Sequence, residues 1–223
     1  MVERAFVDGC FDGYHYGHVN FLFKAKQLCN TLCVGTHTDE EILKFKGIET
    51  INNYKIRYYL LTQCRFIDEL YPRTPYAPSI ETIDKLSCEK YIYSSNVCML
   101  TDGTNALEGL IKDDRLIITD RTEYISTTLI KDKTRERTID TDYLHEIFEN
   151  VKINNYTKDD ELMIIENDWD FITIEDIEKC IDLKKRNPNT KLIINVKSNG
   201  YLTKLDHAII LSSFKFVDGV FVN

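Results

Sequence analysis

Apolar runs alternate with helically spaced apolar positions along the first 130 residues of the chain. Short apolar runs typical of buried strands occur at 5–7, 32–35, 66–70, 90–93 and 116–118. Between them, apolar residues at helical spacing predict helices at 18–28, 39–45, 56–64 and 79–86. Strands that alternate with helices form βαβ units, so we predict an α/β fold with a Rossmann-like, mainly parallel sheet. Such sheets bind ligands at the carboxyl ends of their strands.

The pattern changes after residue 130. The stretch KDKTRERTIDTD is polar and charged, and one amphipathic helix follows it, with Leu144, Ile147, Phe148 and Val151 on one face. Strands are then predicted at 161–165, 191–196 and 216–222, and helices at 173–184 and 205–213. We therefore predict a domain at 1–130, a linker with one helix at 131–160, and a second domain at 161–223.

The second domain resembles the start of the first. Aligning Asp170 with Asp12 gives an offset of 158 (170 − 12), and aligning Asp218 with Asp68 gives 150 (218 − 68), which matches FKFVDGV with CRFIDEL. The alternative is that any two βαβ units share this coarse pattern of apolar and polar positions without being copies of each other. We favour a degenerate, truncated second copy.

Composition narrows the class of partner. The 223 residues carry a net charge of −8, and 43% of them are hydrophobic. An acidic protein is poorly suited to binding nucleic acid or an anionic membrane, although a locally basic site can still bind a small anionic ligand. The seven cysteines form no C-x-x-C motif. This pattern indicates reduced thiols and no metal site. No signal peptide and no apolar run of membrane-spanning length is present, so we expect a cytoplasmic protein without stable membrane insertion.

Two histidines stand where the first strand passes into its helix, in VDGCFDGYHYGH. His15 precedes the helix start and His18 lies one turn inside it. Free backbone N–H groups and the helix dipole favour a phosphate at this place, and Gly17 leaves room for a close approach. Two imidazoles there can donate hydrogen bonds to a phosphate as it gains charge in a transition state.

The string CFDGYHYGH resembles the H-x-G-H signature of the cytidylyltransferase family within the nucleotidyltransferases. Three further blocks, VGTHTDEEILKFKG, RYYLLTQCRFIDEL and RTEYISTTLI, resemble that family in the same order. Within the family, DGCFDGYHYGH, VGTHTDEEI and PYAPSIETIDKLSCEKYIY are most similar to members that act on phosphoethanolamine. The resemblance implies transfer of CMP from CTP to phosphoethanolamine, with Mg²⁺ present, in phosphatidylethanolamine synthesis.

The resemblance also implies roles for individual residues. The catalytic set is His15, His18, Lys46, Arg57 and Arg121. The nucleotide-binding set is Cys10, Phe11, Gly17, Lys44, Thr122, Ser126, Thr127 and Thr128. The candidates for the substrate amine, or for holding basic groups, are Asp12, Asp39 and Asp68. In the second copy, Thr173, Glu175 and Asp176 replace His15, Gly17 and His18, so this copy is expected to be structural or to support a homodimer.

The chain departs from the family pattern at three places. Tyr124 stands where the R-T-x-G signature has glycine, Asn96 stands where an aspartate is usual, and Ile56 replaces an acidic residue. Tyr would strain a backbone that needs a positive φ. Two alternatives therefore stay open beside the phosphoethanolamine reaction. One is the same chemistry on phosphocholine, and the other is a CTP-binding pseudoenzyme with a regulatory or scaffold role.

Overall fold

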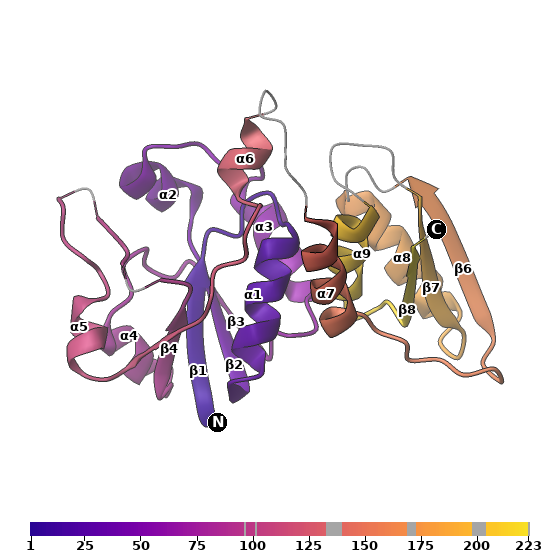
Figure 1. The fold of residues 1–223 in the computed structure, drawn as a ribbon, viewed down its shortest axis with the longest axis horizontal. Coiled ribbons are helices and arrows are strands. Elements are labelled where there is room, and N and C mark those ends of the chain that lie inside the picture. The colour runs from indigo at the N-terminus through magenta and orange to yellow at the C-terminus, as the bar shows by residue number, and fades with distance from the viewer. Residues whose placement is uncertain (96, 101, 133–139, 169–172, 198–203, 223) are drawn as a thin grey trace. The chain divides into compact units, whose positions relative to one another are not determined.

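The chain divides into two compact units in the computed structural model, which describes residues 1–95, 97–100, 102–132, 140–168, 173–197 and 204–222. The first unit comprises Met1–Thr62 and Phe66–Arg135. The second comprises Gln63–Arg65 and Glu136–Asn223. Each unit contains its own parallel sheet (Figure 1).

The first unit is built on a five-stranded parallel sheet in the order β3-β2-β1-β4-β5. Its strands are β1 (Val2–Gly9), β2 (Cys29–Thr36), β3 (Glu69–Pro72), β4 (Lys90–Tyr93) and β5 (Leu116–Ile118). The chain moves outward from β1 in one direction to β3, and in the other to β5. This is a doubly wound Rossmann-like sheet, which confirms the predicted fold class, and its strand order reverses between β1 and β4.

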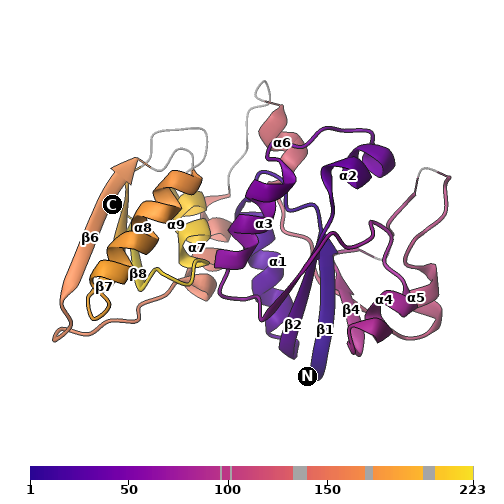
Figure 2. The same ribbon diagram turned by 180° about the vertical axis from the view of Figure 1, so that it is seen from behind.

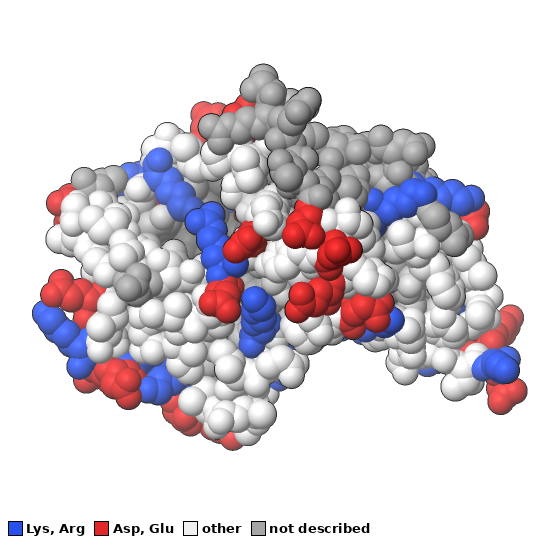
Figure 3. All heavy atoms as spheres, in the orientation of Figure 1, with Lys and Arg blue, Asp and Glu red and all other residues white. Residues whose placement is uncertain are grey.

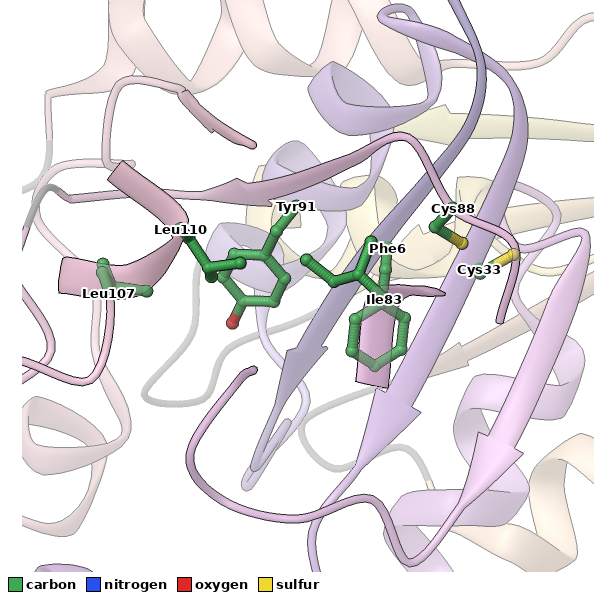
Figure 4. Close-up of a cluster of buried hydrophobic side chains, with 7 residues drawn as sticks. All are labelled: Phe6, Cys33, Ile83, Cys88, Tyr91, Leu107 and Leu110. Atoms are coloured by element: carbon green, nitrogen blue, oxygen red, sulfur yellow. The ribbon is translucent and has the colours of Figure 1, made fainter. Parts of the chain in front are cut away.

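Right-handed crossovers place helices on opposite faces of the sheet before and after that reversal. The helices of this unit are α1 (Tyr16–Lys26), α2 (Asp39–Lys46), α3 (Tyr54–Gln63), α4 (Ile80–Lys85), α5 (Glu108–Lys112) and α6 (Thr127–Lys131). One core cluster joins β1, β2 and β4 to α4 and α5 (Figure 4); its members are Phe6, Cys33, Ile83, Cys88, Tyr91, Leu107 and Leu110. Helix α1 buries Val19, Leu22 and Ala25.

Several predicted element boundaries of this unit are shifted in the structure, and two of the differences from the prediction have a clear physical cause. The third strand begins at Glu69 rather than at residue 66, because Asp68 closes a turn against β2. The N–H of Asp68 donates to the carbonyl of Leu32 at 3.1 Å, and its carboxylate accepts from the N–H of Leu32 at 2.7 Å. The short helix α5 was not predicted, because five residues are too few to show a helical period.

The second unit has a three-stranded parallel sheet in the order β6-β7-β8, seen from behind in Figure 2. Its elements are α7 (Thr141–Val151), β6 (Leu162–Asp168), α8 (Ile174–Arg186), β7 (Lys191–Lys197), α9 (Lys204–Ser212) and β8 (Gly219–Val222). Helix α7 buries Leu144, Ile147, Phe148 and Val151, the face predicted from the sequence. Strands and helices alternate here as predicted, with boundaries shifted by a few residues.

All seven cysteines are free thiols. Within the described part of the chain, no helix is both long enough and apolar enough to cross a bilayer.

Candidate active site

A cavity of about 430 Å³ opens in the first unit at the carboxyl ends of β1 and β4, where the strand order reverses. The position is the one that a doubly wound sheet favours for ligands. Among the residues predicted from the sequence, its lining contains Cys10, Phe11, Asp12, His15, Gly17, His18, Lys46, Arg121, Thr122, Ser126, Thr127 and Thr128. The predicted residues outside this lining are Asp39, Lys44, Arg57 and Asp68.

His15 and His18 together form the N-terminal cap of α1. The Nδ1 atom of His15 accepts a hydrogen bond from the N–H of Gly17 at 3.1 Å, and the Nδ1 atom of His18 accepts from the N–H of His15 at 3.3 Å. The two rings stack with their centroids 3.8 Å apart. An N–H group only donates, so both Nδ1 atoms carry a lone pair. In the neutral rings, each Nε2 therefore holds the hydrogen and acts as a donor.

His18 is neutral at physiological pH. Burial, together with the nearby ammonium of Lys46, lowers the pKa of His18 to about 3. The rings of Phe11 and Tyr14 lie beside it, with centroids 5.4 Å and 6.1 Å from that of His18. Its Nε2 is thus a neutral hydrogen-bond donor in a partly apolar pocket, where electrostatic interactions are stronger than in water.

Gly17 is required because there is no room for a side chain between its backbone and the side chains of Ile125 and His15. A Cβ atom at this position would lie 2.7 Å from Cγ2 of Ile125 and 3.0 Å from the ring of His15. Any side chain would therefore displace the cap or the segment that follows β5.

Two cations, Lys46 at the end of α2 and Arg121 after β5, line the cavity. The ammonium of Lys44 instead lies 4.9 Å from the ring centroid of Phe45 and outside the lining. On the face shown in Figure 3, basic and acidic side chains are interspersed over the described residues. The positive charge of the site is therefore local, which suits a small anion better than an extended polyanion.

Arg57 is fully buried and lies behind the site rather than in it. Its guanidinium donates to the carbonyls of Cys10 at 2.5 Å, Asn52 at 3.1 Å and His37 at 2.9 Å, and to the carboxylate of Asp39 at 2.7 Å. A fifth donor reaches the hydroxyl of Thr36 at 3.4 Å, so all five N–H donors of the guanidinium have acceptors inside the protein. Arg57 therefore fixes the loop between β1 and α1 and acts as a positioning residue.

The carboxylates of Asp12 and Asp68 are both engaged by other groups of the protein. Asp12 accepts from the N–H groups of Ile51 and Asn52, each at 2.9 Å, while still lining the cavity. Asp68 accepts from the ammonium of Lys26 at 2.7 Å. The structure therefore gives both residues roles in fixing loops.

The segment after β5 is held against the start of α1. The hydroxyl of Thr122 accepts from the Asn20 amide at 3.0 Å, and the hydroxyl of Thr127 donates to the carbonyl of Asp12 at 2.8 Å. Ser126 caps α6 by accepting from the N–H of Leu129 at 3.2 Å. The predicted nucleotide-binding hydroxyls therefore also tie the two sides of the cavity together.

Asp8 was not predicted as a site residue, yet it is the most unusual group in the cavity. It lies near the end of β1, is 6% exposed, and lines the cavity. Its Oδ1 accepts from the Tyr91 hydroxyl at 2.6 Å, whereas its Oδ2 has no partner among the described residues. Burial raises the pKa of Asp8 to about 7, although the Tyr91 hydrogen bond opposes this. The sequence signals were the position of this aspartate directly after a buried apolar run and at the start of the string DGCFDGYHYGH.

Tyr124 has a φ of +60°, the left-handed backbone that the glycine of the related signature would adopt without strain. Asn96, the second departure, lies outside the described residues.

We expect the Tyr124→Gly variant to be more stable than the Tyr124→Ala variant by about 1 kcal/mol. Both substitutions remove the ring, which is 40% exposed, and only alanine keeps the strained Cβ. Urea denaturation of the two variants measures the difference directly. Equal stabilities, or a more stable alanine variant, would contradict a strained backbone at this position.

Comparisons with known proteins show which family this sequence resembles. A family model described as cytidylyltransferase-like matches residues 6–196. The ethanolamine-phosphate cytidylyltransferase of Dictyostelium discoideum is 39% identical over 125 residues, which cover 56% of this chain and 34% of that protein. The ethanolamine-phosphate cytidylyltransferase of Saccharomyces cerevisiae is 24% identical over 259 aligned positions, which cover 99% of this chain and 80% of that protein. Choline-phosphate cytidylyltransferase A of Mus musculus is 34% identical over 128 residues, which cover 56% of this chain and 34% of that protein. The chain thus spans about a third of the length of the Dictyostelium relative.

Proposed function

The chain belongs to the cytidylyltransferase-like family, and from that premise we propose that its first unit transfers CMP from CTP to phosphoethanolamine, releasing pyrophosphate. One observation carries the proposal. The stacked pair His15 and His18 presents two Nε2 donors at the start of α1, in a cavity that also holds Lys46 and Arg121. A phosphate group in transfer needs donors and cations at this kind of helix terminus.

The reaction requires no covalent enzyme intermediate. A phosphate oxygen of phosphoethanolamine forms a bond to the α-phosphorus of CTP, and the bond from that phosphorus to the bridging oxygen of the β-phosphate breaks. Charge on the α-phosphate oxygens increases in the transition state. The Nε2 donors of His15 and His18 stabilise that charge, while Lys46 and Arg121 attract the triphosphate. Arg57 contributes by holding the loop that carries the histidines.

Mg²⁺ enters this proposal only with the phosphates of CTP. In the part of the chain that the structure describes, no group of three or more His, Cys, Asp or Glu side chains could hold a metal ion. The two oxygens of Asp12, which lies in the loop between β1 and α1, accept from backbone N–H groups. These residues do not fit a resident metal site, and we route no step through one.

Asp8 is the group that we assign to the ammonium of phosphoethanolamine. Its Oδ2, which meets no partner in the described part of the chain, and its buried position make it a strong acceptor for a cation that enters the cavity. Asp12, Asp39 and Asp68, the carboxylates proposed from sequence, are already hydrogen-bonded to other groups of the protein. The amine assignment therefore moves to Asp8.

We expect Asp8→Asn to raise KM for phosphoethanolamine roughly 10- to 100-fold and to leave KM for CTP unchanged, because it removes a charge-assisted hydrogen bond. In the unsubstituted protein, KM for phosphoethanolamine should fall as pH rises through about 7, since the carboxyl then ionises. The groups that face it are Tyr91, His37 and Glu41.

Steady-state kinetics between pH 6 and pH 8.5 test this dependence. The asparagine variant serves as the control, because it shares the ionisation of the substrate phosphate and lacks only that of Asp8. Unfolding gives a second readout. The folded protein keeps the Asp8 proton up to about pH 7, whereas the unfolded chain releases it near 3.8, so Asp8 costs stability as pH rises from about 3.8 to about 7, and above 7 its contribution no longer changes. Identical pH profiles of the two proteins would refute the assignment.

The proposed reaction is tested by measuring pyrophosphate release from CTP and Mg²⁺, with phosphoethanolamine and phosphocholine in parallel. Release with phosphoethanolamine supports the proposal, and faster release with phosphocholine supports the alternative substrate. Binding of CTP without release in either reaction supports the pseudoenzyme, for which the strained Tyr124 would be a cause.

The second unit is proposed to be a degenerate copy of the first. Lys184 and the N–H of Leu192 donate to the Asp218 carboxylate at 2.5 Å and 2.9 Å, as Lys26 and the N–H of Leu32 donate to Asp68. Thr173 and Asp176 form a capping box on α8, as the histidine pair does on α1. Neither side chain offers an imidazole donor, so we assign catalysis to residues 1–130. A homodimer and a cytoplasmic location remain predictions.

A further inference from the structure

We propose that His37 makes the amine subsite selective for a primary ammonium over a quaternary one, by accepting a hydrogen bond at Nε2 beside the Asp8 carboxylate. The inference rests on the proposed function, because it concerns the group by which the second substrate enters the same cavity. It assigns a role to a buried histidine that the phosphate chemistry does not use.

His37 lies beside Asp8 because of the register between two strands. It directly follows β2, which pairs in parallel with β1 so that Gly9 lies opposite Thr36. The N–H of His37 donates to the carbonyl of Gly9 at 3.4 Å, and the residue is 3% exposed. Asp8 itself lies opposite Gly35, so this pairing places His37 two positions beyond Asp8 in the register.

The hydrogen bonds of His37 decide which ring nitrogen can receive a proton donor. Its Nδ1 lies 3.1 Å from the carbonyl oxygen of Thr74. A carbonyl only accepts, so Nδ1 carries the hydrogen and Nε2 carries a lone pair in the neutral ring. Burial lowers the pKa of His37 to about 4, so the ring is neutral near pH 7. This is the opposite tautomer to that of His15 and His18.

Two hydrogen-bond acceptors, Nε2 of His37 and the carboxylate of Asp8, therefore lie close together beside the cavity. Nε2 of His37 lies 3.8 Å from Oδ1 of Asp8, too far for a direct hydrogen bond. The Asp8 carboxylate offers a further oxygen without a partner among the described residues. An ammonium group between them can donate one N–H to the imidazole and another to the carboxylate. A trimethylammonium group has no N–H to give, so it would leave the imidazole lone pair buried and unpaired.

Aromatic rings hold the imidazole in place. The ring centroid of Tyr76 lies 5.1 Å from that of His37, and Tyr76 in turn stacks on Phe45 at 5.1 Å with an interplanar angle of 12°. With Thr74 on Nδ1 and Tyr76 at its side, His37 is confined. A site that is fixed to receive N–H donors rejects an analogue that lacks them.

The test compares two variants of similar size in the full chain. His37→Leu removes the acceptor, whereas His37→Gln can place an amide oxygen near the position of Nε2. Dissociation constants for phosphoethanolamine and phosphocholine are measured by calorimetry, in parallel with pyrophosphate release. We expect His37→Leu to lower the preference for phosphoethanolamine by at least about 10-fold, through weaker binding of phosphoethanolamine, and His37→Gln to recover part of it. CTP affinity and thermal unfolding report whether each variant is folded.

The binding data decide this proposal separately from the reaction. If the unsubstituted protein binds both amines equally, or if both variants keep its preference, His37 does not select the amine, whatever the turnover. If pyrophosphate is not released although phosphoethanolamine is preferred and His37→Leu abolishes that preference, the selectivity stands and the proposed reaction fails.

A measurement on the unsubstituted protein needs no variant to fold. The ¹⁵N resonance of His37 Nε2 should have the shift of an unprotonated nitrogen, and it should move when phosphoethanolamine is added. Phosphocholine should leave it near its original position. A protonated Nε2 in the free protein, or equal responses to the two ligands, would overturn the proposal.

Discussion

The variant His18→Ala is expected to lower kcat for pyrophosphate release by about 10²- to 10³-fold, the range found when one transition-state donor is lost. The Nε2 of His18 is a neutral donor in the cavity, and its Nδ1 is occupied by the backbone N–H of His15. Alanine removes the donor and half of the capping box. The effect should fall on kcat more than on KM for CTP, because the donor acts mainly on charge that develops during transfer.

Two controls separate catalysis from helix capping in this experiment. His18→Asn can keep an acceptor near the position of Nδ1 and loses the Nε2 donor, so its kcat should fall as far as that of the alanine variant. Thr173→Ala breaks the corresponding cap on α8, which should cost about 1 kcal/mol of stability and leave turnover unchanged. Near-normal turnover of His18→Asn would exclude the donor role.

The variant Arg57→Ala is expected to lower the free energy of unfolding by about 3–5 kcal/mol, because it takes the donor away from three backbone carbonyls at once, each costing about 1–3 kcal/mol when left unsatisfied. Its guanidinium is inaccessible to solvent and satisfies three backbone carbonyls as well as Asp39. Those carbonyls would remain buried without a donor. The variant Arg57→Lys should recover little of the lost stability, because one ammonium group cannot replace the five N–H donors of a planar guanidinium.

Urea denaturation measures this effect, and Lys55 provides a matched control. Lys55 lies on the same helix, α3, but is exposed. Lys55→Ala should change stability by no more than about 0.5 kcal/mol. A loss below about 1 kcal/mol in Arg57→Ala would show that the loop holds its shape without this residue.

The sheet could be predicted from the sequence because apolar periodicity reports burial, and buried strands alternate with helices in parallel sheets. The position of the histidine pair followed in the same way, from the place where a strand passes into a helix. The direction of Arg57 could not be predicted, because a sequence does not reveal whether a long side chain on a helix enters the cavity or turns back into the protein.

Asp8 and His37 illustrate a second limit of sequence reasoning. They lie 29 positions apart (37 − 8), and neither belongs to a motif that suggests a pair. Strand pairing brings them together, and a single carbonyl, that of Thr74, decides which nitrogen of His37 has the lone pair. Hydrogen-bond partners of this kind depend on tertiary structure, so only the fold reveals the chemistry of these residues.

The histidine cap also couples ligand binding to the order of α1. Each ring accepts a backbone hydrogen bond at Nδ1, so in the neutral ring Nε2 holds the hydrogen. Donation from Nε2 to an anion pushes electron density through the ring and makes Nδ1 a better acceptor, as in other chains of hydrogen bonds. An occupied cavity would therefore slow the exchange of the His15 and Gly17 amide hydrogens with solvent, and the first turn of α1 would be the part of the helix whose fraying senses the nucleotide.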